Sequence, residues 1–154
     1  MSEMTARLNL GDAELDADHT RLETLIGQLS DAPTEVVTLA MEALREHAYR
    51  HFEMEDSVLR TTGEGNALCH IEEHAAVLKS LDEVRHRLSE DGMTNEAKSL
   101  LVRRLAAHLL DWLPRHVQEM DASIASHRSR QRFGGSPVAF VGRPKPANAT
   151  ARDE

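Results

Sequence analysis

Histidines and carboxylates recur in this chain at the four-residue spacing that places two side chains on one face of a helix. His51 and Glu55 stand four residues apart in the segment HFEME, and His70 and His74 stand four apart in HIEEH. Residues four apart are rotated by about 40° and lie about 6 Å apart along the helix axis. Each pair could bind a metal ion, although a single pair is more often a hydrogen-bonded core histidine or part of a solvated polar face.

Four segments with helical periodicity carry these residues. Apolar side chains recur at three- and four-residue steps within each segment, and short runs rich in Gly, Pro, Ser, Thr and Asp separate the segments. The segments cover roughly residues 13–30, 33–61, 66–89 and 95–127. Long helices with short connections predict an all-α fold, an antiparallel up-down-up-down four-helix bundle.

Potential metal ligands fall at the helix ends that meet in such a bundle. They lie near the start of the first helix, toward the end of the second, at the start of the third and toward the end of the fourth, and these four ends share one end of the bundle. Convergence at one depth favours a metal site over scattered surface histidines. The candidate ligands are His19, His51, Glu55, His70, His74, His116 and Asp121.

Five imidazoles and two carboxylates are too many ligands for one ion, because a single zinc site takes about four. Two ions fit better if both carboxylates and one solvent-derived oxygen bridge them. The imidazoles then divide three and two, so that one ion is six-coordinate and the other has one position open to a small ligand. Imidazole and carboxylate ligands suit iron.

The segments around these residues resemble those of the hemerythrin family, especially its single-domain bacterial members. LGDAELDADH leads into the first ligand, HFEMED and HIEEH carry the next four, and WLPRHVQEMD carries the last two. The resemblance covers roughly residues 8–125. It implies a cofactor of two non-haem iron ions with a bridging oxo or hydroxo group, and reversible binding of O2 with no catalytic residue. In the ligand assignment that it implies, the saturated iron is held by His70, His74 and His116, the open iron by His19 and His51, and both are bridged by Glu55 and Asp121.

The fourth helix contains a proline two residues before one of its ligands. Pro114 lacks an amide donor and crowds the preceding turn, so a kink is expected there. His116 and Asp121 are five residues apart, a step that rotates a regular helix by about 140° more than one turn. Both side chains therefore reach one site more easily if the helix bends or bulges between them.

Other residues near the ligands have expected positions as well. Leu22, Ile26 and Trp112 are expected to form an apolar ligand pocket at the open iron, and Trp112 could equally be ordinary core. His47 lies one turn before a ligand, and a packed or solvent-facing role is favoured over a functional one. Cys69 is expected to be a buried, small apolar side chain.

The charge of the chain changes sign near its C-terminus. Residues 1–127 contain 12 Lys and Arg against 24 Asp and Glu, whereas residues 128–154 contain 6 against 2. A domain over 1–127 with a basic, poorly ordered Gly- and Pro-containing tail over 128–154 is expected. The overall charge of −8 makes free nucleic acid an unsuitable partner. Neither an apolar signal-peptide core nor a membrane-spanning run of about 18 apolar residues is present, so no membrane association and a cytoplasmic location are expected.

Three classes of function are compatible with this sequence. An O2-binding protein for carriage, storage or delivery is favoured. An oxidoreductase acting on peroxide, nitric oxide or O2 is an alternative. A sensor is another, in which the tail segment SPVAFVG (136–142) and its basic flanks dock an acidic protein partner. The sequence gives no indication of the oligomeric state.

Overall fold

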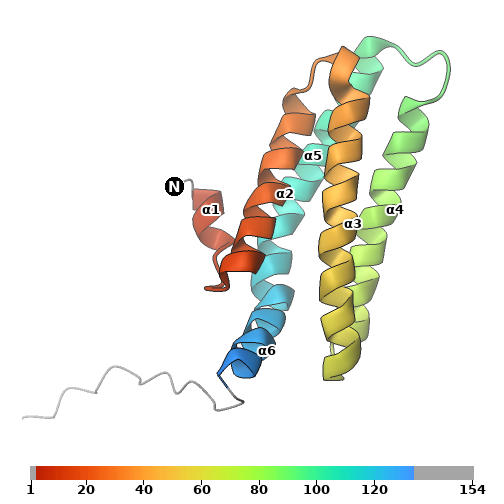
Figure 1. Cartoon of the computed structure of the whole chain (residues 1–154). Helices are drawn as coiled ribbons and strands as arrows, with labels where there is room; N and C mark the ends of the chain where they lie inside the picture. Colours follow the sequence, from red (N-terminus) through yellow and green to blue (C-terminus); the bar gives the residue numbers. More distant parts are fainter. Residues whose placement is uncertain (1–2, 134–154) are drawn as a thin grey trace, which may run out of the picture.

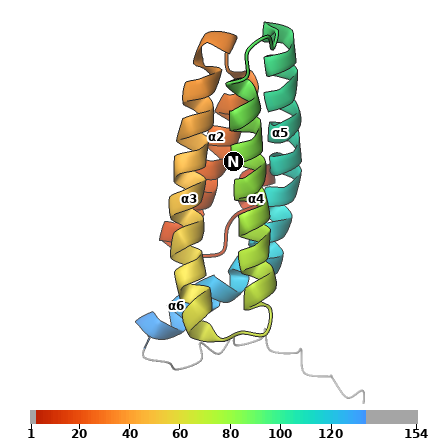
Figure 2. The same ribbon diagram turned by 90° about the vertical axis from the view of Figure 1, so that its right-hand side faces the viewer.

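The expected bundle of four antiparallel helices is confirmed by the computed structural model, which describes residues 3–133 (Figures 1 and 2). The long helices are α2 (Ala13–Asp31), α3 (Val37–Thr62), α4 (Ala67–Leu88) and α5 (Asn95–His116). Shorter elements are α1 (Glu3–Arg7), the 3-10 turn η1 (Thr34–Val36), the π-helical turn η2 (Val117–Asp121) and α6 (Ala122–Arg132). No helix within residues 3–133 is both long enough and apolar enough to cross a bilayer.

Local side-chain chemistry determines where the long helices begin and end. Asp12 caps α2, because its Oδ1 accepts hydrogen bonds from the amides of Glu14 and Leu15 at 3.2 Å each. Thr94 caps α5 by accepting from the amide of Ala97 at 3.1 Å. Gly63 ends α3 in the left-handed conformation with φ +62°, which a residue with a Cβ adopts only with strain. These signals fix the ends of the helices that carry the candidate ligands.

The core consists of two apolar clusters on either side of the ligand level. On α2 the main cluster includes Leu22 and the smaller cluster includes Leu15, with His19 between them. The same order holds on α3, where Glu55 lies between Phe52 of the main cluster and Leu59 of the smaller one. The level at which the ligands lie is therefore covered by apolar side chains above and below it.

The last helical segment continues past the boundary expected between residues 127 and 128. After η2 the chain forms α6 as far as Arg132, so the first five residues of the expected tail are helical. Arg128 donates from Nε to Asp12 at 2.8 Å, which ties α6 to the start of α2. Arginines that the sequence analysis assigned to a basic tail thus take part in the packing of the bundle. The rest of that expected tail, residues 134–154, lies outside the described residues.

Two glycines, one at a helix end and one inside a helix, should respond oppositely when each is replaced by alanine. Gly63→Ala should lower the free energy of unfolding by about 1 kcal/mol, because a Cβ is strained in the left-handed conformation. Gly27, inside α2, has a negative φ and no atom within 4 Å of an added Cβ. Gly27→Ala should therefore raise the same quantity by about 0.5–1 kcal/mol. Urea unfolding of both variants measures the changes, and a Gly63→Ala variant at least as stable as the wild type would contradict the assignment of Gly63 as the helix cap.

Candidate metal centre

The seven residues expected to bind metal lie together at one level of the bundle, from four sides. Every one of these side chains is buried, with an exposed fraction of 3% or less. They form two overlapping groups, and within each group one potential ligand atom per residue lies within 4.8 Å of the others. The first group is Glu55, His70, His74, His116 and Asp121, and the second is His19, His51, Glu55 and Asp121.

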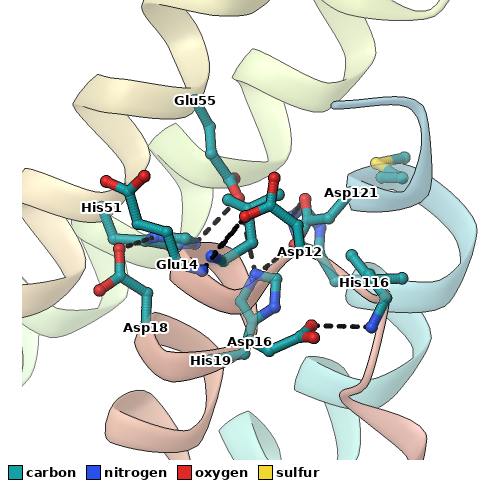
Figure 3. Close-up of polar contacts among 12 residues, drawn as sticks. Asp12, Glu14, Asp16, Asp18, His19, His51, Glu55, His116 and Asp121 are labelled. Carbon is teal, nitrogen blue, oxygen red and sulfur yellow. Dashed lines mark hydrogen bonds and ion pairs between the residues drawn. The ribbon is translucent and has the colours of Figure 1, made fainter. Parts of the chain in front are cut away.

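Glu55 belongs to both groups and turns one oxygen toward each. Its Oε1 lies 2.9 Å from Nε2 of His51 and 3.6 Å from Nε2 of His19. Its Oε2 lies 3.1 Å from Nε2 of His74. Figure 3 shows the Glu55 side chain pointing down toward the level of His19 and His51. A carboxylate placed in this way can contact two neighbouring cations.

Asp121 has the same arrangement from the opposite side. Its Oδ2 lies 3.0 Å from Nε2 of His19, whereas its Oδ1 lies 2.8 Å from Nε2 of His70 and 3.1 Å from Nε2 of His116. Its position confirms the bulge expected in the fourth helix, because η2 spans Val117–Asp121 directly after His116. A π-helical turn holds more residues than an α-helical turn, so a five-residue step brings both side chains to one side.

Three of the five imidazoles are held from outside by a further carboxylate. The Nδ1–H of each ring donates to its partner, in the pairs His51 with Asp18 at 3.0 Å, His74 with Asp56 at 2.7 Å and His116 with Glu73 at 2.9 Å. A proton on Nδ1 leaves the Nε2 lone pair free to point into the cluster, as metal ligation requires. No sequence pattern indicated this role for the three carboxylates, although each stands directly beside a candidate ligand in the sequence.

The atoms that face the centre fit a bound cation. Nε2 of His116 lies 3.2 Å from Nε2 of His70 and 3.0 Å from Nε2 of His74, so imidazole nitrogens face each other where lone pairs would repel. Among residues 3–133, several inward atoms are also buried without a well-formed hydrogen bond. These are Nε2 of His19, Nε2 of His51, both carboxylate oxygens of Glu55 and Oδ2 of Asp121. Cations between these donors would satisfy all of them.

The electrostatics of the cluster depend on close compensation between opposite charges. Burial alone would raise the pKa of the carboxyls of Glu55 and Asp121, but the imidazoles around them hold both pKa values well below the usual range. Burial alone would likewise lower the pKa of His51. The carboxylates of Asp18 and Glu55 outweigh it and raise that pKa to about 10.

Aromatic rings pack against the three-histidine group. Phe52 stacks on the ring of His74 with 4.2 Å between centroids, and Trp112 stacks on the ring of His116 at 4.3 Å. Nε1 of Trp112 also donates to Glu73 at 2.7 Å. Trp112 thus contacts the three-histidine group, whereas the open position was expected beside His19 and His51, and its role in a ligand pocket stays a prediction.

The remaining parts of the expected pocket and its neighbours have clear positions. Leu22 and Ile26 are buried in the main cluster, on the stripe of α2 that also carries His19. His47 is half-buried and packed, with Nε2 donating to the backbone carbonyl of Asp18 at 3.1 Å.

The expectation that Cys69 is buried is wrong, because it is exposed. One residue rotates a helix by about 100°, so a buried His70 turns its neighbour toward solvent.

Comparison with known proteins gives one family. Residues 10–126 match the family model described as hemerythrin HHE cation binding domain. A curated relative, bacteriohemerythrin from Ralstonia nicotianae, is 34% identical over 119 residues, which cover 77% of this chain and 82% of the relative. A comparison with solved structures found no significant match.

The raised pKa of His51 predicts that metal binding releases protons. In protein prepared without metal, an imidazole with a pKa of about 10 carries a proton on Nε2 at pH 7, and that proton must leave before the nitrogen can bind a cation. The affinity for metal should therefore increase by up to about tenfold per pH unit from pH 7 toward pH 10, for one displaced proton. Calorimetric titration with Co(II) in buffers of different protonation enthalpy measures the release.

Asp18→Asn provides the matched variant for this measurement. Removing the anion beside Nδ1 lowers the pKa of His51, so fewer protons should be released per chain at pH 7. Heats of binding that do not depend on the buffer would contradict the prediction.

Proposed function

Because the chain belongs to the hemerythrin family, we propose that it binds O2 reversibly at a centre of two non-haem iron ions. The proposal takes the two groups of side chains as two ion positions that share their carboxylates. The three-imidazole position is held by His70, His74 and His116, the two-imidazole position by His19 and His51, and both by Glu55 and Asp121.

The observation that carries the proposal is the sharing of each buried carboxylate between the two groups. Oε1 of Glu55 lies 2.9 Å from an imidazole of one group, and Oε2 lies 3.1 Å from an imidazole of the other. A site for one ion would use about four of the seven donors and leave the others buried without a partner. The mixture of imidazole and carboxylate supports iron as the metal.

The unequal division of the imidazoles supports a small molecule as the ligand. With equal numbers of shared oxygens, the ion beside His19 and His51 has one protein ligand fewer than its neighbour. Ferrous ions, when bound, would supply the electrons for O2 binding, and the residues around them would hold the ions and exclude water. A coordination position that faces the interior admits only a ligand of small size.

The donor set favours reversible binding over activation of O2. Di-iron sites of ferritin-like proteins use four carboxylates and two histidines. Five neutral imidazoles and two carboxylates place less negative charge on the metal and therefore stabilise its oxidised forms less. Apolar residues on both sides of the cluster, such as Leu15 and Leu22, exclude the water that would supply protons for irreversible oxidation.

The proposal is tested with protein loaded anaerobically with Fe(II). One ion for each of the two groups is expected. Addition of O2 should produce an absorbance change that disappears on degassing and returns over repeated cycles. A spectrum that never accumulates while a reductant is steadily consumed would instead indicate an oxidoreductase. One tightly bound zinc ion with no uptake of iron would contradict the di-iron centre.

Leu22→Asn tests the apolar surroundings of the two-imidazole position. Leu22 is 3% exposed and lies one turn from His19 on the same face of α2. A polar amide there should admit water and make the irreversible oxidation of the loaded protein severalfold faster, with iron content little changed. The measurement is the decay of the O2-dependent absorbance in air.

Leu29→Asn is the control for this substitution. Leu29 lies in the same core cluster, ten residues and roughly 15 Å along the helix from His19. Both variants should lose roughly 3 kcal/mol of stability. Only Leu22→Asn should oxidise faster, and equal decay in both would place the pocket elsewhere.

A further inference from the structure

A cluster of four charged residues joins the start of α2 to α6. Oδ2 of Asp12 accepts hydrogen bonds from Nε of Arg128 at 2.8 Å and from Nη2 of Arg132 at 3.2 Å. Nη2 of Arg128 also donates to Glu14. The Asp12 side chain is 4% exposed and that of Arg128 is 18% exposed, so solvent and salt screen this pair far less than a surface pair. We call these four residues the latch.

Asp12 uses both of its carboxylate oxygens, one for each helix. Oδ1 accepts from the amides at the start of α2, and Oδ2 accepts from the two arginines of α6. One buried carboxylate therefore caps one helix and anchors another.

The latch lies in register with the metal centre. Asp12 is seven residues before His19, and Arg128 is seven residues after Asp121. Seven residues span about two helical turns, so along each segment the latch lies roughly 10 Å from the contact between His19 and Asp121. Nε2 of His19 and Oδ2 of Asp121 are 3.0 Å apart.

The smaller apolar cluster contributes residues between the latch and the metal centre on both segments. Leu15 is four residues before His19, Ala125 is four residues after Asp121, and both belong to the smaller core cluster. The charged latch, this apolar cluster and the pair of candidate ligands therefore follow one another along α2 and along the last helical segment.

The latch helps to set the direction of α6, because Asp121 is the last residue of a π-helical turn. The hydrogen bonds of η2 do not continue the regular ladder of α5, so α5 alone does not fix the direction of α6. The latch gives α6 a second anchor, on the helix that carries His19. Asp121 is then held between α5 on one side and the latch on the other.

We propose that the latch is a positioning device for the two-imidazole position: it holds His19 and Asp121 at the separation that an ion needs and thereby determines how firmly this position keeps its ion. The inference rests on the proposed function. His19 belongs only to the two-imidazole group, so loss of the latch affects that position most. Arg128 and Arg132 lie beyond residues 10–126, which the family model matches.

The experiment compares three single variants loaded with Fe(II) under anaerobic conditions. Asp12→Asn removes the charge but keeps a good N-cap acceptor, and Arg128→Met removes the guanidinium but keeps the apolar stem. Arg45→Met is the matched control, because Arg45 forms an ion pair between α3 and α4 with Asp82 and its side chain is 32% exposed. Each protein is mixed with excess EDTA, and the release of iron is followed over time.

Both latch variants should release one of the two ions on the order of tenfold faster than the wild type, and the other ion with a smaller change, because it shares Asp121 but not His19. The double variant Asp12→Asn/Arg128→Met should accelerate the release by less than the product of the two single effects, because either substitution already removes the ion pair between Asp12 and Arg128. Arg45→Met should behave like the wild type. Equal release from the wild type and the latch variants would overturn the inference. If Arg128→Met does not fold, Asp12→Asn decides the question.

A second measurement separates failure of the latch from failure of the proposed function. A wild type that never takes up two iron ions rejects the proposed function. In that case the latch is tested by amide hydrogen exchange of the protein without metal. Arg128→Met should accelerate exchange over residues 13–19, and Arg45→Met should not. Unchanged exchange in Arg128→Met would overturn the latch whatever the metal content.

Discussion

Two carboxylates buried at the centre of the bundle constrain the rest of the structure. Glu55 and Asp121 are at most 1% exposed, and an uncompensated buried charge costs several kcal/mol. Imidazoles from four sides compensate these charges, most of them at distances near 3 Å. Each long helix must therefore keep the position along the bundle axis, and the rotation about its own axis, that bring its imidazole to the carboxylates. A shift of one helix by a single turn would leave a carboxylate without a counter-charge. The apolar clusters on either side can be repacked at moderate cost, whereas this polar level specifies one register.

The acidic excess of the chain is partly explained by a second layer around this centre. Asp18, Asp56 and Glu73 are only partly buried, and each accepts the outward Nδ1–H of an imidazole. Charges therefore alternate from the inside outward, from carboxylate to imidazole to carboxylate. The outer carboxylates keep the rings oriented whether or not the inner atoms bind a cation. Part of the net charge of −8 thus belongs to the architecture of the centre rather than to a solvated surface.

The convergence of the inner candidate ligands was predictable from the sequence because helix spacing and up-down topology bring them to one depth without adjustment. The outer carboxylates were not, because their role depends on the rotation of each helix about its own axis, which packing decides. The buried position expected for Cys69 failed for the same reason. The bulge before Asp121 followed from a spacing of five residues that a regular helix cannot bring to one side. The extent of α6 was missed because Arg128 and Arg132 were interpreted by their composition and not by a partner more than a hundred residues away.

A ligand at the end of a helical bulge requires support from both directions along the chain. His116 lies at the end of α5 and is held by Glu73 and by stacking on Trp112, so its position is set before the bulge begins. Asp121 lies after the bulge, where the regular ladder has been interrupted, and both of its oxygens face the imidazoles of the centre. Its position therefore depends on the helix that comes after it. A bundle that ended at Asp121 would contain every ligand, but its last one would sit at a frayed helix end. The turns of α6, packed against the start of α2, give this carboxylate the rigidity that the other ligands obtain from the middle of long helices.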